Sequence, residues 1–318
     1  MFKRLTSFSP FIVLSTLLLS CQNSRCQEDV VCQTYVHRYG VPLEAEDWLA
    51  RGKHGQVVSL RKDGVTVTQS YDAGVLDGEC SYTFPHRDII HKKECYVQGN
   101  LVEETVHYSS GMPQQSIVYH HPNQIVTTWY ENGAPQSKEE FADGKVVTGE
   151  YYNLSNQIES RIEDGHGLRT CRNDQNVVEY VDTIHDGEMV QRTTYHPNGA
   201  PATAATYLNG QIEGERRTYL PAGEPATIET WTGDCQHGWT TEYIYGEKVA
   251  EVPYVKGQKH GVEQRFRDDG QFLVQEVTWV KGKQQGPCTS YVGNTKHVDW
   301  YFANRKVNKP TYDALMNQ

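Results

Sequence analysis

The sequence predicts an all-β protein built from repeats, and three observations lead to that prediction. Glycines recur at a fixed period, strand-like runs alternate within each period, and a Gly-x-Pro phrase returns at matching places. Between Gly187 and Gly282, each row opens on a glycine, at spacings of 23, 23, 24 and 25 residues. Periods of this length are typical of repeat architectures. We expect an elongated, twisted antiparallel sheet of about twelve stacked β-hairpins, preceded by a helical signal segment.

Each row is predicted to form one hairpin. In the clearest row, residues 191–195 and 202–207 alternate Thr, Ala and Tyr with other side chains, and His196-Pro197-Asn198-Gly199 separates the two runs. Alternation with period two is typical of strands, and Asn-Gly accommodates the positive φ angles of a tight turn. A single hairpin cannot bury its aromatic side chains, so the array is expected to be stable only as a set.

The Gly-x-Pro phrase fixes where the second strand of a row begins. Proline has no N–H to donate to a sheet, so it is expected at the first position of the outgoing strand. The phrase occurs five times, with its prolines at Pro42, Pro113, Pro135, Pro201 and Pro225.

The composition agrees with a thin repeat array and argues against a nucleic acid partner. The chain has 318 residues, of which 37% are hydrophobic, and its mean hydropathy is −0.66. It carries 40 acidic and 30 basic residues, for a formal net charge of −10. Phosphate binding needs a basic face, so we expect no nucleic acid partner.

The N-terminus predicts export. Lys3 and Arg4 precede a short apolar run at residues 11–19, which is too short to span a bilayer, and Leu18-Leu19-Ser20-Cys21 follows. This run resembles the lipobox of bacterial lipoproteins, which implies a signal peptide at 1–20, acylation (palmitate) at Cys21 and a tether at 21–28. Because Gln22 rather than Asp follows Cys21, the resemblance favours the outer over the inner membrane. An ordinary cleaved signal is the alternative.

The repeat pattern resembles the MORN-type repeat in its bacterial variant. The resemblance lies in phrases such as Tyr130-Glu131-Asn132-Gly133 and in Gly-x-x-x-Gly spacings such as Gly210/Gly214 and Gly282/Gly286. It implies a β-hairpin array over residues 29–309, with a C-terminal tail at 310–318. It implies little about function, because such repeats serve as scaffolds, membrane-associated arrays and partner-binding surfaces.

Cysteines and histidines offer few candidates for chemistry. Export makes disulfides feasible, and we expect Cys80–Cys95 across one hairpin and Cys26–Cys32. Histidines that precede glycines, among them His166, His237 and His260, are interpreted as turn residues. Rows lie roughly 10 Å apart, which is too far for a shared ion. We therefore expect no metal and no cofactor.

No hydrolase, metalloprotease or phosphate-loop motif occurs in the sequence, and we expect no catalytic residues. The best candidate surface is a strip of aromatic side chains, one per row, that could recognise a partner on one face of the sheet. Any single member is equally interpretable as core. The strip consists of Tyr195, Tyr219, Tyr243, Phe266 and Tyr291.

The function predicted from these observations is a lipid-anchored lipoprotein of the bacterial cell envelope that binds an envelope or extracellular protein as a scaffold. One alternative is an envelope or cell-wall hydrolase with its site in the irregular rows at residues 144–186. Another alternative is an antitoxin-like or immunity-type inhibitor. A carboxylate cluster in a pocket at 144–186 would favour the hydrolase.

Overall fold

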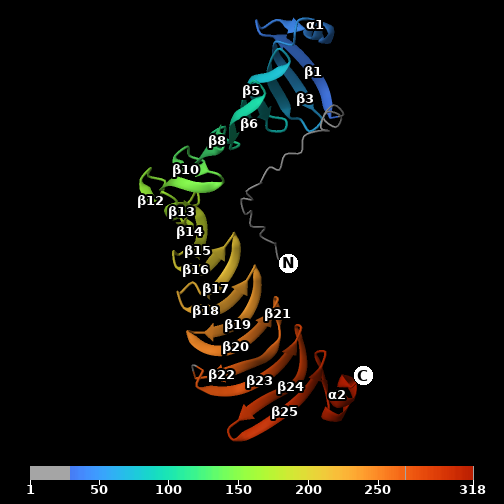
Figure 1. Ribbon diagram of the computed structural model, residues 1–318, viewed down its shortest axis with the longest axis vertical. Coiled ribbons are helices and arrows are strands. Elements are labelled where there is room, and N and C mark those ends of the chain that lie inside the picture. Colours follow the sequence, from blue (N-terminus) through green and yellow to red (C-terminus); the bar gives the residue numbers. More distant parts are fainter. Residues whose placement is uncertain (1–28, 269, 318) are drawn as a thin grey trace.

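A computed structural model describes residues 29–268 and 270–317, which form one long, open antiparallel sheet of 26 strands. Strands stack one after another along the long axis, with a short helix near each end (Figure 1). Consecutive strands pair throughout, except that β1 pairs with both β2 and β3, and β20 with both β21 and β22. The predicted all-β fold of stacked hairpins is confirmed.

The elements follow the chain in this order: β1 Val30–His37, β2 Pro42–Leu43, α1 Ala45–Ala50, β3 Gly55–Arg61, β4 Thr66–Asp72, β5 Val75–Thr83, β6 Ile90–Val97, β7 Asn100–His107, β8 Pro113–His120, β9 Asn123–Trp129, β10 Pro135–Ala142, β11 Lys145–Tyr152, β12 Ile158–Glu163, β13 His166–Arg172, β14 Val178–His185, β15 Glu188–Tyr195, β16 Pro201–Leu208, β17 Gln211–Tyr219, β18 Pro225–Thr232, β19 Cys235–Ile244, β20 Glu247–Val255, β21 Gln258–Lys259, β22 Gly261–Arg267, β23 Phe272–Val280, β24 Lys283–Val292, β25 Thr295–Phe302, β26 Arg305–Val307 and α2 Lys309–Met316. The five prolines of the Gly-x-Pro phrase each open a strand, as predicted: β2, β8, β10, β16 and β18.

The first row departs from the hairpin pattern. Its second strand is reduced to β2, and helix α1 takes the remaining place, so β1 pairs directly with β3. Glu46 and Asp47 lie in the first turn of α1, where carboxylates interact favourably with the helix dipole. Trp48 is buried against Tyr35, with ring centroids 5.5 Å apart. The helix thus covers the N-terminal end of the sheet, at a place where the sequence predicts only hairpins.

The second position of the Gly-x-x-x-Gly motif requires glycine for a steric reason. Gly214 and Gly286 have φ angles of +93° and +116°, and a Cβ at either position would lie 2.9 Å or 3.3 Å from a threonine on the preceding strand. Thr278, beside Gly286, donates its hydroxyl to the Pro287 carbonyl at 2.9 Å. Gly78 and Gly238 have the same arrangement with Ser70 and Thr230. The motif therefore marks the point where two strands approach across a bulge.

The two faces of the sheet differ in burial. The pairing registers place most buried side chains of the array on one side, which we call the core face. The opposite side, which we call the open face, has two buried strand residues, Ser116 and Thr289, among those described. The core face includes Val57, Val67, Cys80, Tyr151, Ile162, Asp182, Ile184, Ala205, Val252, Glu263, Val277 and Cys288.

The core face contains carboxylates that are buried together with their partners. Glu94 accepts hydrogen bonds from the hydroxyls of Tyr82 and Tyr96 and lies 2.8 Å from the Lys92 ammonium. Burial and the nearby Glu94 charge raise the pKa of Tyr96 to about 12. Similar carboxylates occur on β10, β14, β18 and β22, as Glu139, Asp182, Glu229 and Glu263. A single-layer sheet thus covers its core with ion pairs and aromatic hydroxyls as well as with aliphatic groups.

The Cys80–Cys95 disulfide prediction is wrong. Both thiols are free, and the register sets Cys80 opposite Glu94 and Cys95 opposite Glu79. A bulge between Tyr82 and Thr83 shifts the pairing by one residue, and neighbouring residues of a strand point to opposite faces. The two cysteines therefore lie on opposite sides of the sheet. Cys26 lies outside the described residues, so the Cys26–Cys32 pairing stays a prediction.

Candidate binding surface

The predicted aromatic strip lies on the open face. Its members sit near the ends of β15, β17, β19, β22 and β24, on every second full-length strand. Each directly follows or precedes a core-face residue, as Tyr195 follows Thr194 and Phe266 follows Arg265, so all five point to the open side. All five are partly exposed. Since two strand spacings separate successive members, the strip spans about 40 Å.

The strip alternates rings with charged neighbours. The Lys248 ammonium lies 4.5 Å from the centre of the Phe266 ring, and the Lys296 ammonium lies 5.8 Å from the centre of the Tyr291 ring. Tyr291 donates its hydroxyl to Glu276 at 2.6 Å, and that hydrogen bond raises the pKa of Tyr291. Cations placed over rings and hydroxyls held by carboxylates keep the rings oriented while leaving part of each ring accessible.

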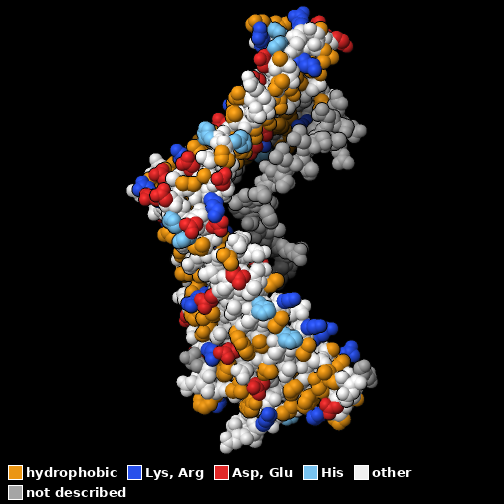
Figure 2. Space-filling model, in the orientation of Figure 1, with side chains coloured by type: hydrophobic (Ala, Val, Ile, Leu, Met, Phe, Trp, Pro, Cys, Tyr) orange, Lys and Arg blue, Asp and Glu red, His pale blue; other side chains and the backbone are white. Residues whose placement is uncertain are grey.

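A second apolar row crosses the same face and was not predicted from the sequence. The registers align Trp239 with Pro253, Val262 with Thr278, and Pro287 with Trp300. Trp239 is 53% exposed and Val262 is 41% exposed. Trp300 is covered by helix α2, where Tyr312 lies 4.9 Å away between ring centroids. Figure 2 shows hydrophobic side chains gathered over the C-terminal part of the array.

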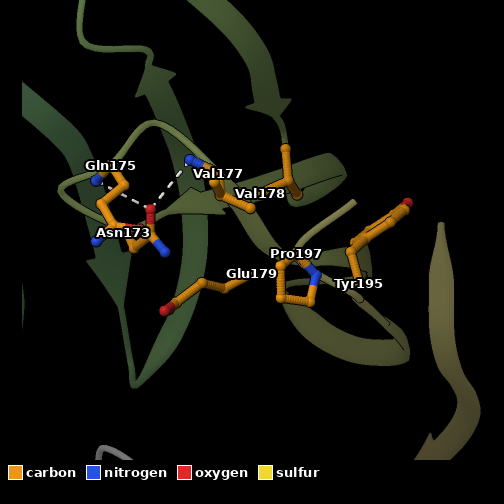
Figure 3. Close-up of a pocket in the computed structure, with 7 residues that line it drawn as sticks. All are labelled: Asn173, Gln175, Val177, Val178, Glu179, Tyr195 and Pro197. Atoms are coloured by element: carbon orange, nitrogen blue, oxygen red, sulfur yellow. Dashed lines mark hydrogen bonds between the residues drawn. The ribbon is translucent and has the colours of Figure 1, made fainter. Parts of the chain in front are cut away.

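A shallow depression lies at the beginning of the strip. It has a volume of about 340 Å³ and lies between the β13–β14 turn and the end of β15, where Tyr195 and Pro197 form one wall (Figure 3). Asn173 shapes the other wall, because its side-chain oxygen accepts hydrogen bonds from the backbone N–H groups of Gln175 and Val177, each at 3.0 Å. Glu179 is the one carboxylate in the lining. The depression therefore extends the strip but offers no carboxylate pair.

The irregular middle rows hold carboxylates, but arginines engage them. Asp182 is fully buried and binds Arg192 through two hydrogen bonds of 2.7 and 2.9 Å. Arg169 lies 2.7 Å from Glu139 and 3.5 Å from Asp182, so it bridges the two acids. Tyr151 donates its hydroxyl to Glu139 as well. General acid or base catalysis requires access to a substrate, and both carboxylates have little of it: Asp182 is fully buried and the Glu139 side chain is 14% exposed.

The histidines before glycines lie in different settings. His237 and His260 lie on or beside β19 and β21, one row apart, and no ion-pair partner or shared metal cluster is found for either among residues 29–268 and 270–317. His54 contacts Asp72 at 2.5 Å. His166 meets His185 and Asp186, which forms a group of three potential metal ligands. Sequence reasoning missed this group, because it compared histidines one row apart rather than histidines on adjacent strands.

Cys21 and the predicted signal peptide lie outside the described residues. In the part of the chain that the structure describes, no helix has the length and apolar character needed to cross a bilayer.

The sequence matches no family model and no curated protein. Among solved structures, S. aureus TarM, in complex with Fondaparinux, alpha-GlcNAc-glycerol and UDP, is similar over 39% of this chain and 21% of that chain, at 11% identity and a TM-score of 0.20. The TcdB2-TccC3-Cdc42 structure is similar over 86% of this chain and 21% of that chain, at 11% identity and a TM-score of 0.15. This chain spans about a fifth of the length of those chains. Such low TM-scores do not indicate a shared fold.

Proposed function

We propose that this protein is a lipid-anchored lipoprotein of the bacterial cell envelope whose MORN-like repeat array binds a protein partner along its open face. The observation that carries the proposal is the aromatic strip: five rings on alternate full-length strands, all on the face that the molecule does not use for its core. Aromatic side chains with polar handles dominate the binding energy of protein interfaces.

An extended segment of the partner fits this surface better than a compact ligand does. The strip is about 40 Å long, which corresponds to about 12 residues of extended chain. The apolar row from Trp239 to Trp300 runs parallel to it on the C-terminal strands. Together the two lines form a broad surface with apolar anchors and polar gaps, which is the composition of protein interfaces rather than of small-molecule pockets.

The binding proposal is tested with the double variant Tyr219→Ala/Tyr243→Ala. Proteins that co-purify with the wild-type chain from envelope extracts are quantified, and we expect the specific partner to fall at least about tenfold for the double variant, since hot-spot rings contribute about 2 kcal/mol or more each. Tyr245→Ala is the matched control, because Tyr245 is 86% exposed and lies in the turn just after the strip. Equal recovery with the double variant contradicts the proposal.

The anchor is tested separately. Labelled palmitate should be incorporated into the wild-type chain and not into Cys21→Ala, and the variant should leave the membrane fraction, since acyl chains supply the membrane affinity. Labelling that persists in Cys21→Ala contradicts the lipoprotein assignment but leaves the binding surface untouched.

A further inference from the structure

His166, His185 and Asp186 gather at the end of the β13–β14 ladder. The last registered pair is Gly167 with Ile184, so His166 and His185 are the next residues across from each other. Their ring centroids are 4.6 Å apart and the rings are nearly perpendicular. Asp186 contacts both: one carboxylate oxygen lies 3.4 Å from His166 Nε2 and the other lies 3.1 Å from His185 Nδ1.

The backbone beneath these side chains is tightly fixed. The Gly187 N–H donates to the Gly165 carbonyl at 2.9 Å, and the Gly165 N–H donates to the Val147 carbonyl at 2.8 Å. A Cβ on Gly165 would lie 2.9 Å from the Gly187 nitrogen, so the two turns are in direct contact. The three side chains therefore project from a turn pair whose relative position is set by hydrogen bonds.

The spacing of the ligand atoms suits a transition metal. An ion with about 2.0–2.1 Å bonds to nitrogen and oxygen in tetrahedral geometry holds its ligand atoms about 3.3 Å apart. The two nitrogen–oxygen distances bracket that value, and all three ligand atoms lie within 4.8 Å of one another. The side chains of the group are 51%, 63% and 74% exposed, so an ion can enter and keep open coordination positions.

The surrounding charge also favours a cation. Glu163 pairs with His166 across β12 and β13, and Asp164 precedes the turn glycine; both carboxylates are exposed. Lys145, which lies beside Gly187, is held by Glu188 at 3.0 Å. Two imidazoles and a carboxylate form a donor set that zinc and its neighbours in the first transition row bind, whereas calcium and magnesium require more oxygen ligands.

We propose that His166, His185 and Asp186 bind one divalent transition-metal ion of the zinc class. This inference is independent of the binding function proposed for the aromatic strip. The competing reading is that protonated imidazoles share the Asp186 carboxylate as a surface ion pair. Metal binding requires both His166 and His185 at once, whereas an ion pair with Asp186 needs only one of them.

The test is a calorimetric titration of the untagged, metal-stripped full chain in detergent with Zn²⁺. We expect one ion per chain in the tightest phase, an affinity that falls by about 10- to 100-fold or more in His185→Gln, and loss of the phase in His166→Gln/His185→Gln. His54→Gln is the matched control, because His54 and Asp72 form the same kind of contact with a single imidazole. It should leave the titration unchanged.

Three results overturn the proposal: no zinc binding by the wild-type chain, equal binding by the double variant, or an equal loss in His54→Gln. Because the three side chains are exposed, the variants should keep the circular dichroism spectrum of the wild type. Should the double variant fail to fold, anomalous scattering at the zinc edge from crystals of the wild type decides the question, since density at any other place contradicts the site.

Discussion

The core face and the open face of this sheet are built from similar side chains and differ in what surrounds them. On the core face, Asp182 and Glu263 are almost wholly buried beside arginine or lysine. On the open face, Glu215 pairs with Arg217 at 2.5 Å, yet both side chains remain about half exposed. Ion pairs of the same kind therefore stabilise the fold on the core face, whereas on the open face they are solvated and contribute little to stability.

This difference shows how a single layer of strands can be stable and still leave one face available for binding. Among residues 29–268 and 270–317, no second layer covers either face over most of the array, since the two helices α1 and α2 lie near its two ends (Figure 1). Burial on the core face comes from neighbouring rows whose long side chains lie over one another. The aromatic side chains of the open face are therefore not needed for the core. Substitutions on the core face should mainly lower stability, and substitutions on the open face should mainly lower partner binding.

The largest expected effect is on the core face at Asp182. Asp182→Ala removes the carboxylate that Arg192 binds and leaves that partly buried cation uncompensated, whereas Arg169 keeps its contact with Glu139. Breaking a buried pair of this kind costs about 3–5 kcal/mol. Urea unfolding followed by circular dichroism measures the cost. The matched open-face variant, Glu215→Ala, should leave the unfolding midpoint nearly unchanged, and equal midpoints for the two variants would remove the distinction between the faces.

A smaller effect is expected where the core face requires a glycine. Gly167 has a φ angle of +147°, and a Cβ there would lie 2.1 Å from the Arg161 carbonyl oxygen. Gly167→Ala should therefore cost about 3 kcal/mol, from backbone strain and displaced main chain together. Gly246 has a φ angle of +80° with nothing near its Cβ position, so Gly246→Ala should cost only about 1 kcal/mol. Thermal unfolding of both variants checks the order.

A pH effect is expected at Glu263. Burial raises its pKa, but hydrogen bonds from Lys259 and Arg265 outweigh that effect and hold the pKa below the ordinary value of 4.5. A carboxyl with a depressed pKa contributes stability above its unfolded-state pKa and loses that contribution as pH falls through the folded-state value. The wild type should therefore lose more unfolding free energy than Glu263→Gln between pH 5 and pH 3, where pH-dependent unfolding curves of both proteins are compared. Parallel curves would contradict the assignment.

A small effect on stability is expected on the open face at Trp239. This side chain is 53% exposed, so Trp239→Ala should lower the unfolding free energy by only about 0.5–1 kcal/mol. Its effect on partner binding should be much larger, since exposed tryptophans contribute strongly to interfaces. Calorimetric unfolding beside quantitative co-purification separates the two effects. A loss of stability as large as that of Asp182→Ala would place Trp239 in the core instead.

Much of the fold follows from local sequence signals, and its exceptions have identifiable causes. The glycine period and the prolines locate strands correctly because they act through φ angles and missing N–H donors, which are local properties. Helix α1 was missed because its six residues, Ala45–Ala50, are too few to show a helical period within a repeat pattern that extends over 29–309. The Cys80–Cys95 pairing failed because one extra residue in the β5–β6 ladder, which the spacing does not reveal, places the two cysteines on opposite faces.

The candidate sites, like the fold, combine features that local sequence signals predict with features that they do not. Strand alternation alone placed the aromatic strip on one face. Trp239 was missed because its exposure depends on which side of the sheet forms the core, and that is decided by packing between strands of neighbouring rows rather than by the local sequence. The group at His166 could have been predicted from the sequence. His166 directly follows the opening glycine Gly165, and His185 lies two residues before the next opening glycine, so the two histidines face each other across adjacent strands. The distance of 4.6 Å between the His166 and His185 ring centroids reflects that adjacency rather than the row spacing.

Crosslinking in living cells tests most directly whether the open face, and not the core face, binds the partner. A photoreactive amino acid is placed at position 219 or 243 on the aromatic strip, and at position 265 on the core face, where Arg265 is 52% exposed. We expect both strip positions to capture the same envelope or extracellular protein after illumination, and position 265 to capture none. Capture of that protein from position 265 at equal yield, with none from the strip, would contradict this expectation.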